Sequence, residues 1–223
     1  AYVPIVREQL PEIPAENILA EPCARNTAPC IAYACWKIKA KHPAANVVVT
    51  PSDALVLDGD EFRRVIRTAL DFTAAGERIV TIGITPTRPE TGYGYIEADG
   101  EDVKRFVEKP DLTTAEKYLL AGNFYWNSGI FCFKVKTFLD ELKKYSPDIL
   151  NAAKIALTRA KKEDGEPIRI ALEDMKAIPS NSIDYAVMEK SSKVKVVPSD
   201  IGWSDLGSFD SLYGEYPHDE NGN

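Results

Sequence analysis

The sequence contains 223 residues, of which 44% are hydrophobic and 27% are charged, a composition typical of globular proteins. The formal net charge of −7 argues against sequence-independent nucleic-acid binding, which needs Lys and Arg facing phosphates. No apolar run reaches the roughly 20 residues that cross a bilayer, so no membrane partner is expected. The length suits one large α/β domain, with or without a small appendage.

The four cysteines form no C-x-x-C pair and have no histidine at metal-ligand spacing. They are Cys23, Cys30, Cys35 and Cys132. We expect reduced, mostly buried thiols, which fits a cytoplasmic location.

The first half of the chain alternates helix and strand patterns. Asn26 or Thr27 can cap the first helix, and Pro29 falls in its first turn, where a missing N–H costs nothing. Helices are expected over 26–40 and 61–75, and strands buried on both faces over 47–50 and 79–84. This order predicts a right-handed crossover and a doubly wound, mostly parallel, Rossmann-like sheet.

In the second half, the alternation of helix and strand patterns ends at a loop rich in Pro, Gly and Thr over 85–94. Short antiparallel strands are expected over 93–98 and 103–108. The remaining expected elements are helices over 114–121, 136–145, 148–161 and 182–189, strands over 129–135 and 194–198, and a turn over 202–207 that leads into a final helix. The fold class is therefore α/β with a small antiparallel subregion.

The chain contains only two histidines that could act in catalysis. The only histidines, His42 and His218, each lie in a polar turn beside Pro. A Ser-His-Asp or Cys-His nucleophilic device is therefore not expected.

Two aspartates are candidate metal ligands. Asp53 directly follows a predicted strand, at the carboxyl end where α/β sheets bind ligands. Asp205 lies between Gly202 and Gly207, which allow tight turns and a close approach to a ligand. Taken singly, Asp53 is equally consistent with a helix cap and Asp205 with an Asx-turn. As a pair they can hold Mg²⁺, which takes few protein ligands and keeps waters and substrate phosphates.

Three further segments offer polar groups. The turn that contains Gly92 and Gly94 can lay backbone N–H groups against an oxygen-rich ligand, or it is simply a Gly-permitted loop. Glu108 could accept hydrogen bonds from sugar hydroxyls and Lys109 could meet a phosphate, although such a pair is usually a solvated surface feature. Asn127 offers donors and acceptors to a polyol, or belongs to a turn that starts a strand.

Taken together and in order, these segments resemble the mannose-1-phosphate guanylyltransferase family of sugar-phosphate nucleotidyltransferases. The likeness runs from about Glu21 to the end. The matching segments are E-P (21–22) with R-N-T-A-P (25–29), P-S-D (51–53), P-T-R-P-E-T-G-Y-G-Y-I (86–96), F-V-E-K-P (106–110), W-N-S-G (126–129), S-I-D-Y-A-V-M-E-K (182–190) and G-W-S-D-L-G (202–207). F-V-E-K-P occurs widely among nucleotidyltransferases, whereas the segments at 25–29, 86–96 and 182–190 point to the guanylyl branch.

The resemblance implies a nucleotidyltransferase (GT-A-like) fold and the transfer of GMP from GTP to mannose 1-phosphate with Mg²⁺, giving GDP-mannose and pyrophosphate. The implied contacts are Asp53 and Asp205 with the metal, Arg25, Asn26 and Thr27 with guanine, Gly94, Glu108 and Asn127 with mannose, and Lys109 with its phosphate. We also expect a homo-oligomer, most simply a dimer. A phosphate monoester is already largely dianionic at neutral pH, so no general base is needed. Catalysis then reduces to positioning and charge neutralisation.

The chain departs from the family pattern in three places. The family's opening strand and Gly-rich loop, G-G-x-G-x-R-L-x-P-x-S, have no match, and neither does its C-terminal β-helix or extension. Ala54 stands where the family usually has His, a change we expect to be tolerated or to tune the activity mildly. We therefore expect 1–223 to be a partial catalytic domain that is weakly active or inactive alone.

Two alternatives remain open from the sequence. One is another sugar-1-phosphate nucleotidyltransferase, such as a glucose-1-phosphate thymidylyl- or uridylyltransferase, and the segment Arg25–Pro29 would discriminate because it faces the base. The other is a non-catalytic sugar-nucleotide-binding regulatory subunit, which Mg²⁺-dependent turnover would exclude.

Overall fold

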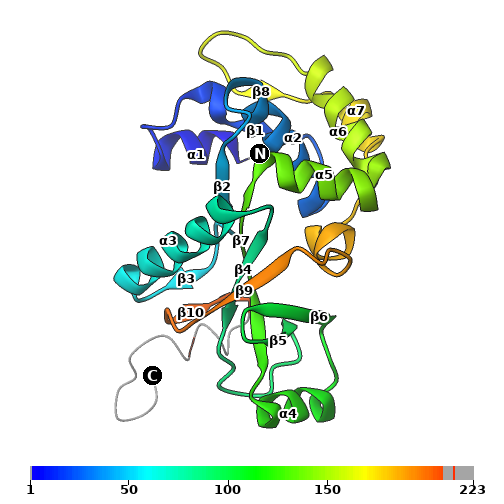
Figure 1. Ribbon diagram of the computed structural model, residues 1–223. Coiled ribbons are helices and arrows are strands. Elements are labelled where there is room, and N and C mark those ends of the chain that lie inside the picture. Colours follow the sequence, from blue (N-terminus) through cyan, green and yellow to red (C-terminus); the bar gives the residue numbers. More distant parts are fainter. Residues whose placement is uncertain (1, 208–212, 214–223) are drawn as a thin grey trace. The chain divides into compact units, whose positions relative to one another are not determined.

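The computed structural model describes residues 2–207 and residue 213, and the chain divides into two compact units (Figure 1). Unit 1 comprises Ala1–Ala45 and Val135–Ser191, and unit 2 comprises Asn46–Lys134 and Ser192–Asn223. Within the described residues, no helix is both long and apolar enough to cross a membrane. The final helix predicted after residue 207 lies, apart from Tyr213, outside the described residues.

Three helices that pack against one another form the core of unit 1. They are α2 (Thr27–Lys41), α5 (Val135–Tyr145) and α6 (Pro147–Arg159). The predicted first helix is confirmed, with Asn26 as its N-cap, because the Asn26 side chain accepts a hydrogen bond from the Thr27 amide at 2.8 Å. On this helix Ile31 and Cys35 are buried, at most 6% exposed, whereas Ala34 and Ile38 are partly buried.

Short elements complete unit 1. They are α1 (Val3–Gln9), η1 (Ala15–Asn17), β1 (Leu19–Ala20), β8 (Ile168–Arg169), α7 (Leu172–Lys176) and η2 (Asp184–Met188). Strands β1 and β8 pair in parallel. The helix predicted over 182–189 is present only as the π-helical turn η2, a wider form of helix that hydrophobic periodicity does not distinguish from an α-helix.

Unit 2 is built on a six-stranded mixed sheet in the order β2-β7-β4-β9-β6-β5, with β5 also pairing β7. Its strands are β2 (Asn46–Val49), β4 (Ile79–Ile84), β5 (Gly94–Asp99), β6 (Asp102–Glu108), β7 (Phe124–Lys134) and β9 (Val194–Ser199). A separate pair of short strands consists of β3 (Leu55–Val56) and β10 (Trp203–Ser204). Of the pairings in the large sheet, only β4–β9 is parallel within the described residues.

The observed sheet differs from the prediction. The sequence predicts a mostly parallel, doubly wound sheet, whereas most strand pairs of this sheet are antiparallel. Strands β2 and β4 are connected through a helix as predicted, but the antiparallel strand β7 lies between them. Because β7 comes from a distant part of the chain, local patterning does not reveal its insertion. The predicted antiparallel subregion is confirmed by the β5–β6 and β5–β7 pairings.

Strand β2 also differs from its prediction. It lies at the edge of the sheet, its residues alternate between exposed and partly buried, and Val48 is 38% exposed. The expectation of burial on both faces is therefore wrong. A short β-branched run fits an edge strand as well as a central one, since β-propensity depends on the neighbours a strand acquires.

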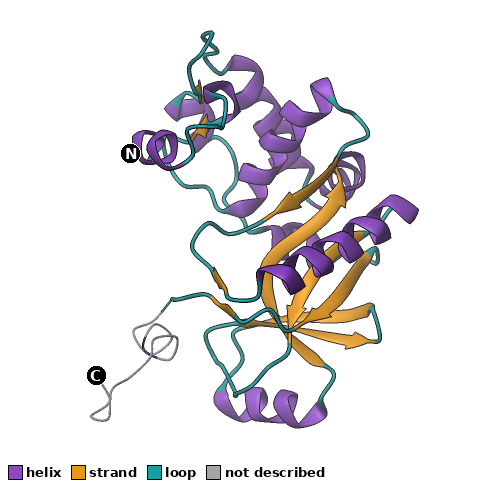
Figure 2. Ribbon diagram, turned by 90° about the vertical axis from the view of Figure 1, so that its left-hand side faces the viewer, coloured by secondary structure: helices purple, strands orange, loops and turns teal. Residues whose placement is uncertain are grey.

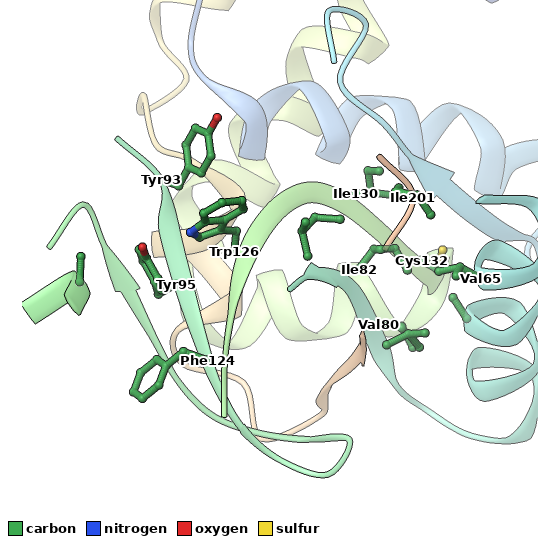
Figure 3. Packing of buried hydrophobic residues seen from close by; sticks show 14 residues of the cluster. Val65, Val80, Ile82, Tyr93, Tyr95, Phe124, Trp126, Ile130, Cys132 and Ile201 are labelled. Carbon is green, nitrogen blue, oxygen red and sulfur yellow. The ribbon is translucent and has the colours of Figure 1, made fainter. Parts of the chain in front are cut away.

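Helices α3 (Gly59–Ala75) and α4 (Leu112–Ala121) pack on this sheet (Figure 2). Asp58 caps α3 by accepting hydrogen bonds from the Asp60 and Glu61 amides, and Val65 and Ala69 are fully buried. Figure 3 shows Val65 near Val80 and Cys132 of the sheet, with Tyr93, Trp126, Tyr95 and Phe124 at the other end of the cluster. Every residue of β4 is buried, as predicted.

The strand predicted over 129–135 begins earlier, at Phe124. Consequently Asn127 lies inside β7 and not in a turn that precedes it. The register between β4 and β7 shifts between Thr81 and Gly83, and Gly129 has a φ of 71°. Irregularities of this kind interrupt the hydrogen-bond ladder and bend the strand locally.

All four cysteines are free. Cys35 and Cys132 are buried as expected, and burial raises the pKa of each thiol to about 12. Cys30 is exposed and Cys23 partly buried, so the expectation of mostly buried thiols holds for only half of them.

Candidate functional site

The two predicted metal ligands lie at the same end of one short ladder. Strands β3 and β10 are antiparallel, and Ser204 is the partner of Leu55. Because antiparallel strands run in opposite directions, the residue after Ser204 and the residues before Leu55 leave the ladder at the same end. The register therefore brings Asp205 and Asp53, which are far apart in the sequence, into one neighbourhood.

Asp205 is held by two hydrogen bonds to a single oxygen. The Tyr93 hydroxyl donates to Asp205 Oδ1 at 2.8 Å, and the Gly207 amide donates to the same atom at 3.0 Å. Leu206, which lies between Asp205 and Gly207, has a left-handed φ of 49°. This conformation folds the chain back so that the Gly207 amide reaches the Asp205 carboxylate. The Tyr93 contact spans 112 positions of sequence, so no local signal in the sequence points to it.

Asp53 has a different environment. It is exposed and forms no hydrogen bond or ion pair with another residue of the described part of the chain. Across those same residues, no group of three or more His, Cys, Asp and Glu side chains is gathered around a possible metal position. Two carboxylates are nevertheless enough for Mg²⁺, which usually completes its shell with waters and substrate phosphates.

An aromatic cluster surrounds Tyr93. Its ring meets Trp126 edge-on at 5.2 Å between centroids and Trp203 at 5.4 Å, and Figure 3 shows Tyr93 directly beside Trp126. The Arg88 guanidinium lies 5.3 Å from the Trp126 ring centroid. Edge-to-face pairs of this kind each add about 0.5–1.5 kcal/mol beyond buried area, so the Tyr93 ring has a well-defined position.

The three predicted mannose contacts are neighbours in unit 2. Gly94 is the register partner of Glu108. A Cβ atom added at Gly94 would lie 2.6 Å from Glu108 Oε1 and 3.5 Å from Asn127 Cβ. Only glycine leaves Glu108 in this position, because real Cβ atoms do not approach other atoms so closely. The residues thus form a compact polar group with the donor and acceptor types that recognise a polyol.

The adjacent residues are also fixed by hydrogen bonds. Lys109 has a φ of 44°, and its amide donates to the Tyr93 carbonyl at 3.3 Å. The Gly92 amide donates to Glu90 Oε1 at 2.9 Å, so this N–H, expected to face a ligand, already has an acceptor within its own loop. Asn127 Oδ1 accepts from the Gly129 amide at 3.2 Å.

The predicted guanine contacts belong to unit 1, where their side chains serve the fold. The Arg25 guanidinium donates to the carbonyls of Met175 at 3.2 Å and Lys176 at 2.6 Å. Thr27 Oγ1 accepts from the Ile183 amide at 2.9 Å. Asn26, the helix cap, has a left-handed φ of 69°. The Arg25 bonds hold the start of α2 against α7, and the Thr27 bond holds it against the residue that precedes η2.

Unit 1 also contains a cavity of about 640 Å³ at the C-terminal ends of α2 and α6. None of the predicted site residues lines it. Its charged lining consists of four lysines, Lys37, Lys41, Lys154 and Lys162, and four carboxylates, Glu16, Glu163, Asp164 and Glu166. These charges balance, and helix C-termini carry partial negative charge, so the cavity has no electrostatic preference for a phosphate.

Comparison with known proteins places these features in context. The chain is 45% identical to a mannose-1-phosphate guanylyltransferase of Escherichia coli over 98% of its own length and 48% of that protein. The chain therefore spans about half the length of the curated relatives it matches.

Two solved structures share the fold. A Helicobacter pylori structure described as a mannose-6-phosphate isomerase has a TM-score of 0.77 and 36% identity, over 83% of this chain and 73% of that one. A Thermus thermophilus structure described as a mannose-1-phosphate geranyltransferase also has a TM-score of 0.77, with 29% identity over 97% of this chain and 70% of that one.

The nucleotidyl transferase family model matches residues 3–222. This match covers almost the whole chain, including both units and every predicted site residue. The chain belongs to the nucleotidyl transferase family.

Proposed function

We propose that this protein transfers GMP from GTP to mannose 1-phosphate, giving GDP-mannose and pyrophosphate. The observation that carries the proposal is the joining of two groups in unit 2 by Tyr93. Its hydroxyl bonds to Asp205, and its carbonyl accepts from Lys109, beside the group formed by Gly94, Glu108 and Asn127. A carboxylate suited to a divalent cation thus adjoins a polar group suited to a sugar phosphate. The similarity to mannose-1-phosphate guanylyltransferases supports the same reaction.

Mg²⁺ fits the two aspartates. Asp205 Oδ1 accepts two hydrogen bonds, which leaves Oδ2 to act as a ligand, and Asp53 is exposed and unpaired among the described residues. A hard cation prefers such carboxylate oxygens. When bound, Mg²⁺ would supply charge neutralisation at the α-phosphate and the leaving pyrophosphate.

The protein's own residues would mainly bind and orient the substrates. Glu108 and Asn127 would hold mannose hydroxyls, and Lys109 would pair with the sugar phosphate. A phosphate oxygen of the sugar forms the new bond to the α-phosphorus as the bond to the β-phosphate oxygen breaks, and pyrophosphate leaves. Because the attacking phosphate is already largely dianionic at neutral pH, no side chain has to remove a proton.

Guanine recognition would involve the segment Arg25–Thr27 through its backbone. The side chains of Arg25 and Thr27 are occupied by hydrogen bonds within unit 1, so they shape the segment instead of reaching for the base. GTP and mannose 1-phosphate are the proposed partners, without nucleic acid or membrane. The homo-oligomer and the cytoplasmic location remain predictions from the sequence.

A competition assay tests the proposal. This chain, alone and within the longest open reading frame that contains it, is incubated with mannose 1-phosphate, Mg²⁺ and equimolar GTP, UTP and dTTP. GDP-mannose should be the main product and should disappear on chelation of Mg²⁺. UDP- or dTDP-sugar as the main product would favour another member of the family. Consumption of none of the three nucleotides, with no nucleotide sugar formed by either form of the protein, would contradict the proposal.

A further inference from the structure

We propose that Tyr93 and Gly207 are positioning residues that orient the Asp205 carboxylate so that only Oδ2 is presented to the divalent cation. The inference rests on the proposed function in one respect, the presence of a cation at Asp205. It concerns two residues that the sequence did not single out for this role. Together they constrain both oxygens of the same carboxylate.

The first constraint acts on Oδ1. A carboxylate oxygen has two lone pairs, and Oδ1 already accepts from the Tyr93 hydroxyl at 2.8 Å and from the Gly207 amide at 3.0 Å. At least one donor would have to be displaced before this oxygen could bind a metal. Oδ1 is therefore the anchored oxygen and Oδ2 the ligand.

The second constraint acts on the space around Oδ2. A Cβ atom added at Gly207 would lie 2.7 Å from Oδ2 and 3.2 Å from the Asp205 carboxyl carbon. Any other residue at this position would push the carboxylate out of its present plane. Gly207 thus positions the carboxylate in two ways. Its amide donates a hydrogen bond to Oδ1, and its lack of a side chain leaves the space that Oδ2 occupies.

The Tyr93 hydroxyl can impose this geometry because its ring has little freedom. Tyr93 is 9% exposed, and its ring lies against the edges or faces of Trp126 and Trp203 at 5.2 and 5.4 Å. Its carbonyl accepts from the Lys109 amide, which fixes the backbone as well. A rigid donor of this kind is what a metal-binding carboxylate needs to keep one orientation.

One consequence is a preference among cations. Mg²⁺ and Mn²⁺ are served by a single, well-aimed oxygen, since Mg²⁺ demands nearly ideal octahedral geometry. Ca²⁺ tolerates irregular shells and often takes both oxygens of a carboxylate. Anchoring Oδ1 should therefore favour Mg²⁺ over Ca²⁺, and releasing it should erode that preference.

The test measures metal binding directly, without catalysis. Mn²⁺ is titrated into this chain and free Mn²⁺ is followed by its EPR signal, with Mg²⁺ and Ca²⁺ as competitors. Tyr93→Phe keeps the ring and removes the hydroxyl. We expect it to weaken Mn²⁺ and Mg²⁺ binding by about 10-fold or more, in the range found for lost outer-shell partners of metal ligands, and to weaken Ca²⁺ binding less. Gly207→Ala should change the same quantities in the same direction.

Tyr118→Phe is the matched control, because Tyr118 belongs to the same unit and stacks on Phe124 at 3.9 Å, and the donors to Asp205 Oδ1 are Tyr93 and Gly207 instead. It should leave all three affinities unchanged. Equal loss of Mg²⁺ and Ca²⁺ binding in Tyr93→Phe, or no loss of either, would overturn the positioning role. Asp205→Asn separates the two proposals: if it binds Mn²⁺ as well as the unaltered chain does, the metal site itself is wrong, whereas if it loses binding and Tyr93→Phe does not, only the role of Tyr93 fails.

Discussion

The predicted site residues of the two units differ in how their side chains are used. In unit 1, Arg25 and Thr27 direct their polar atoms to the backbone of Met175, Lys176 and Ile183. In unit 2, Asp53 is unpaired among the described residues and Asp205 keeps one oxygen clear of the hydrogen bonds that hold the other. The side chains of Arg25 and Thr27 therefore stabilise the local fold of unit 1, whereas the carboxylates of Asp53 and Asp205 provide negative charge for a ligand in unit 2.

The same contrast appears in the backbone. Asn26 takes a left-handed conformation to cap α2, and Leu206 takes one to bring the Gly207 amide to Asp205. The first stabilises a helix start and the second orients a candidate ligand. Substitutions in unit 1 should therefore change stability first, and substitutions in unit 2 should change activity first.

The largest expected effect comes from removing charge in unit 2. Asp205→Asn and Asp53→Asn should each lower kcat for GDP-mannose formation by about 10²–10³-fold, the size of effect found when one group that stabilises transition-state charge is lost. Steady-state kinetics, in whichever form of the protein forms GDP-mannose in the competition assay, measures this. Asp60→Asn is the control, because Asp60 is an exposed residue of α3 whose carboxylate pairs with Arg63 on the same helix. A normal kcat in both site variants would contradict the proposed metal site.

An intermediate effect is expected from adding a side-chain atom to the polar group formed by Gly94, Glu108 and Asn127. Gly94→Ala places a Cβ atom 2.6 Å from Glu108 Oε1, so Glu108 must move. Because misplacing a binding group by about 1 Å can cost about 100-fold in rate, kcat/KM for mannose 1-phosphate should fall by about 10- to 100-fold. The KM for GTP should change little.

Gly59→Ala provides the comparison for this variant, since its added Cβ would meet only the end of the Arg63 side chain at 3.5 Å. It should behave like the unaltered protein. If Gly94→Ala raised the KM for GTP and left that for mannose 1-phosphate unchanged, the group would have been assigned to the wrong substrate.

The smallest expected effect lies in unit 1 and concerns stability. Thr27→Val removes the acceptor for the Ile183 amide and leaves that amide without its partner, which costs about 1–3 kcal/mol. Urea unfolding should show a lower midpoint, whereas Thr27→Ser, which keeps the hydroxyl, should unfold close to the unaltered chain. A change in preference between GTP and UTP with no loss of stability would show that the side chain itself contacts the base.

Much of the local structure could be predicted because it depends on local chemistry. The cap at Asn26, the amphipathic helix α3, the buried strand β4 and the hairpin of β5 and β6 all follow from periodicity and capping residues. The position of β7 could not be predicted, since it depends on pairing between segments far apart in the chain. The exposure of β2 at the sheet edge follows from the same long-range order.

The candidate site divides along the same line. Residue types and motifs singled out Asp53, Asp205, Gly94, Glu108 and Asn127, and the structure brings the last three together. The Tyr93 hydroxyl bond to Asp205 could not be foreseen, because nothing in the composition of a Gly- and Tyr-rich turn says which distant carboxylate it will meet. The steric need for glycine at 207 likewise became visible only with the carboxylate in place.

The central claim is that Asp53 and Asp205 share one divalent cation. The most direct measurement is a crystal structure of this protein grown with Mn²⁺, with anomalous diffraction recorded at the manganese edge. The account predicts one anomalous peak at coordination distance from Asp205 Oδ2 and from an oxygen of Asp53, with Oδ1 of Asp205 still bonded to Tyr93. A peak bound by only one of the two carboxylates, or no peak between them, would contradict it.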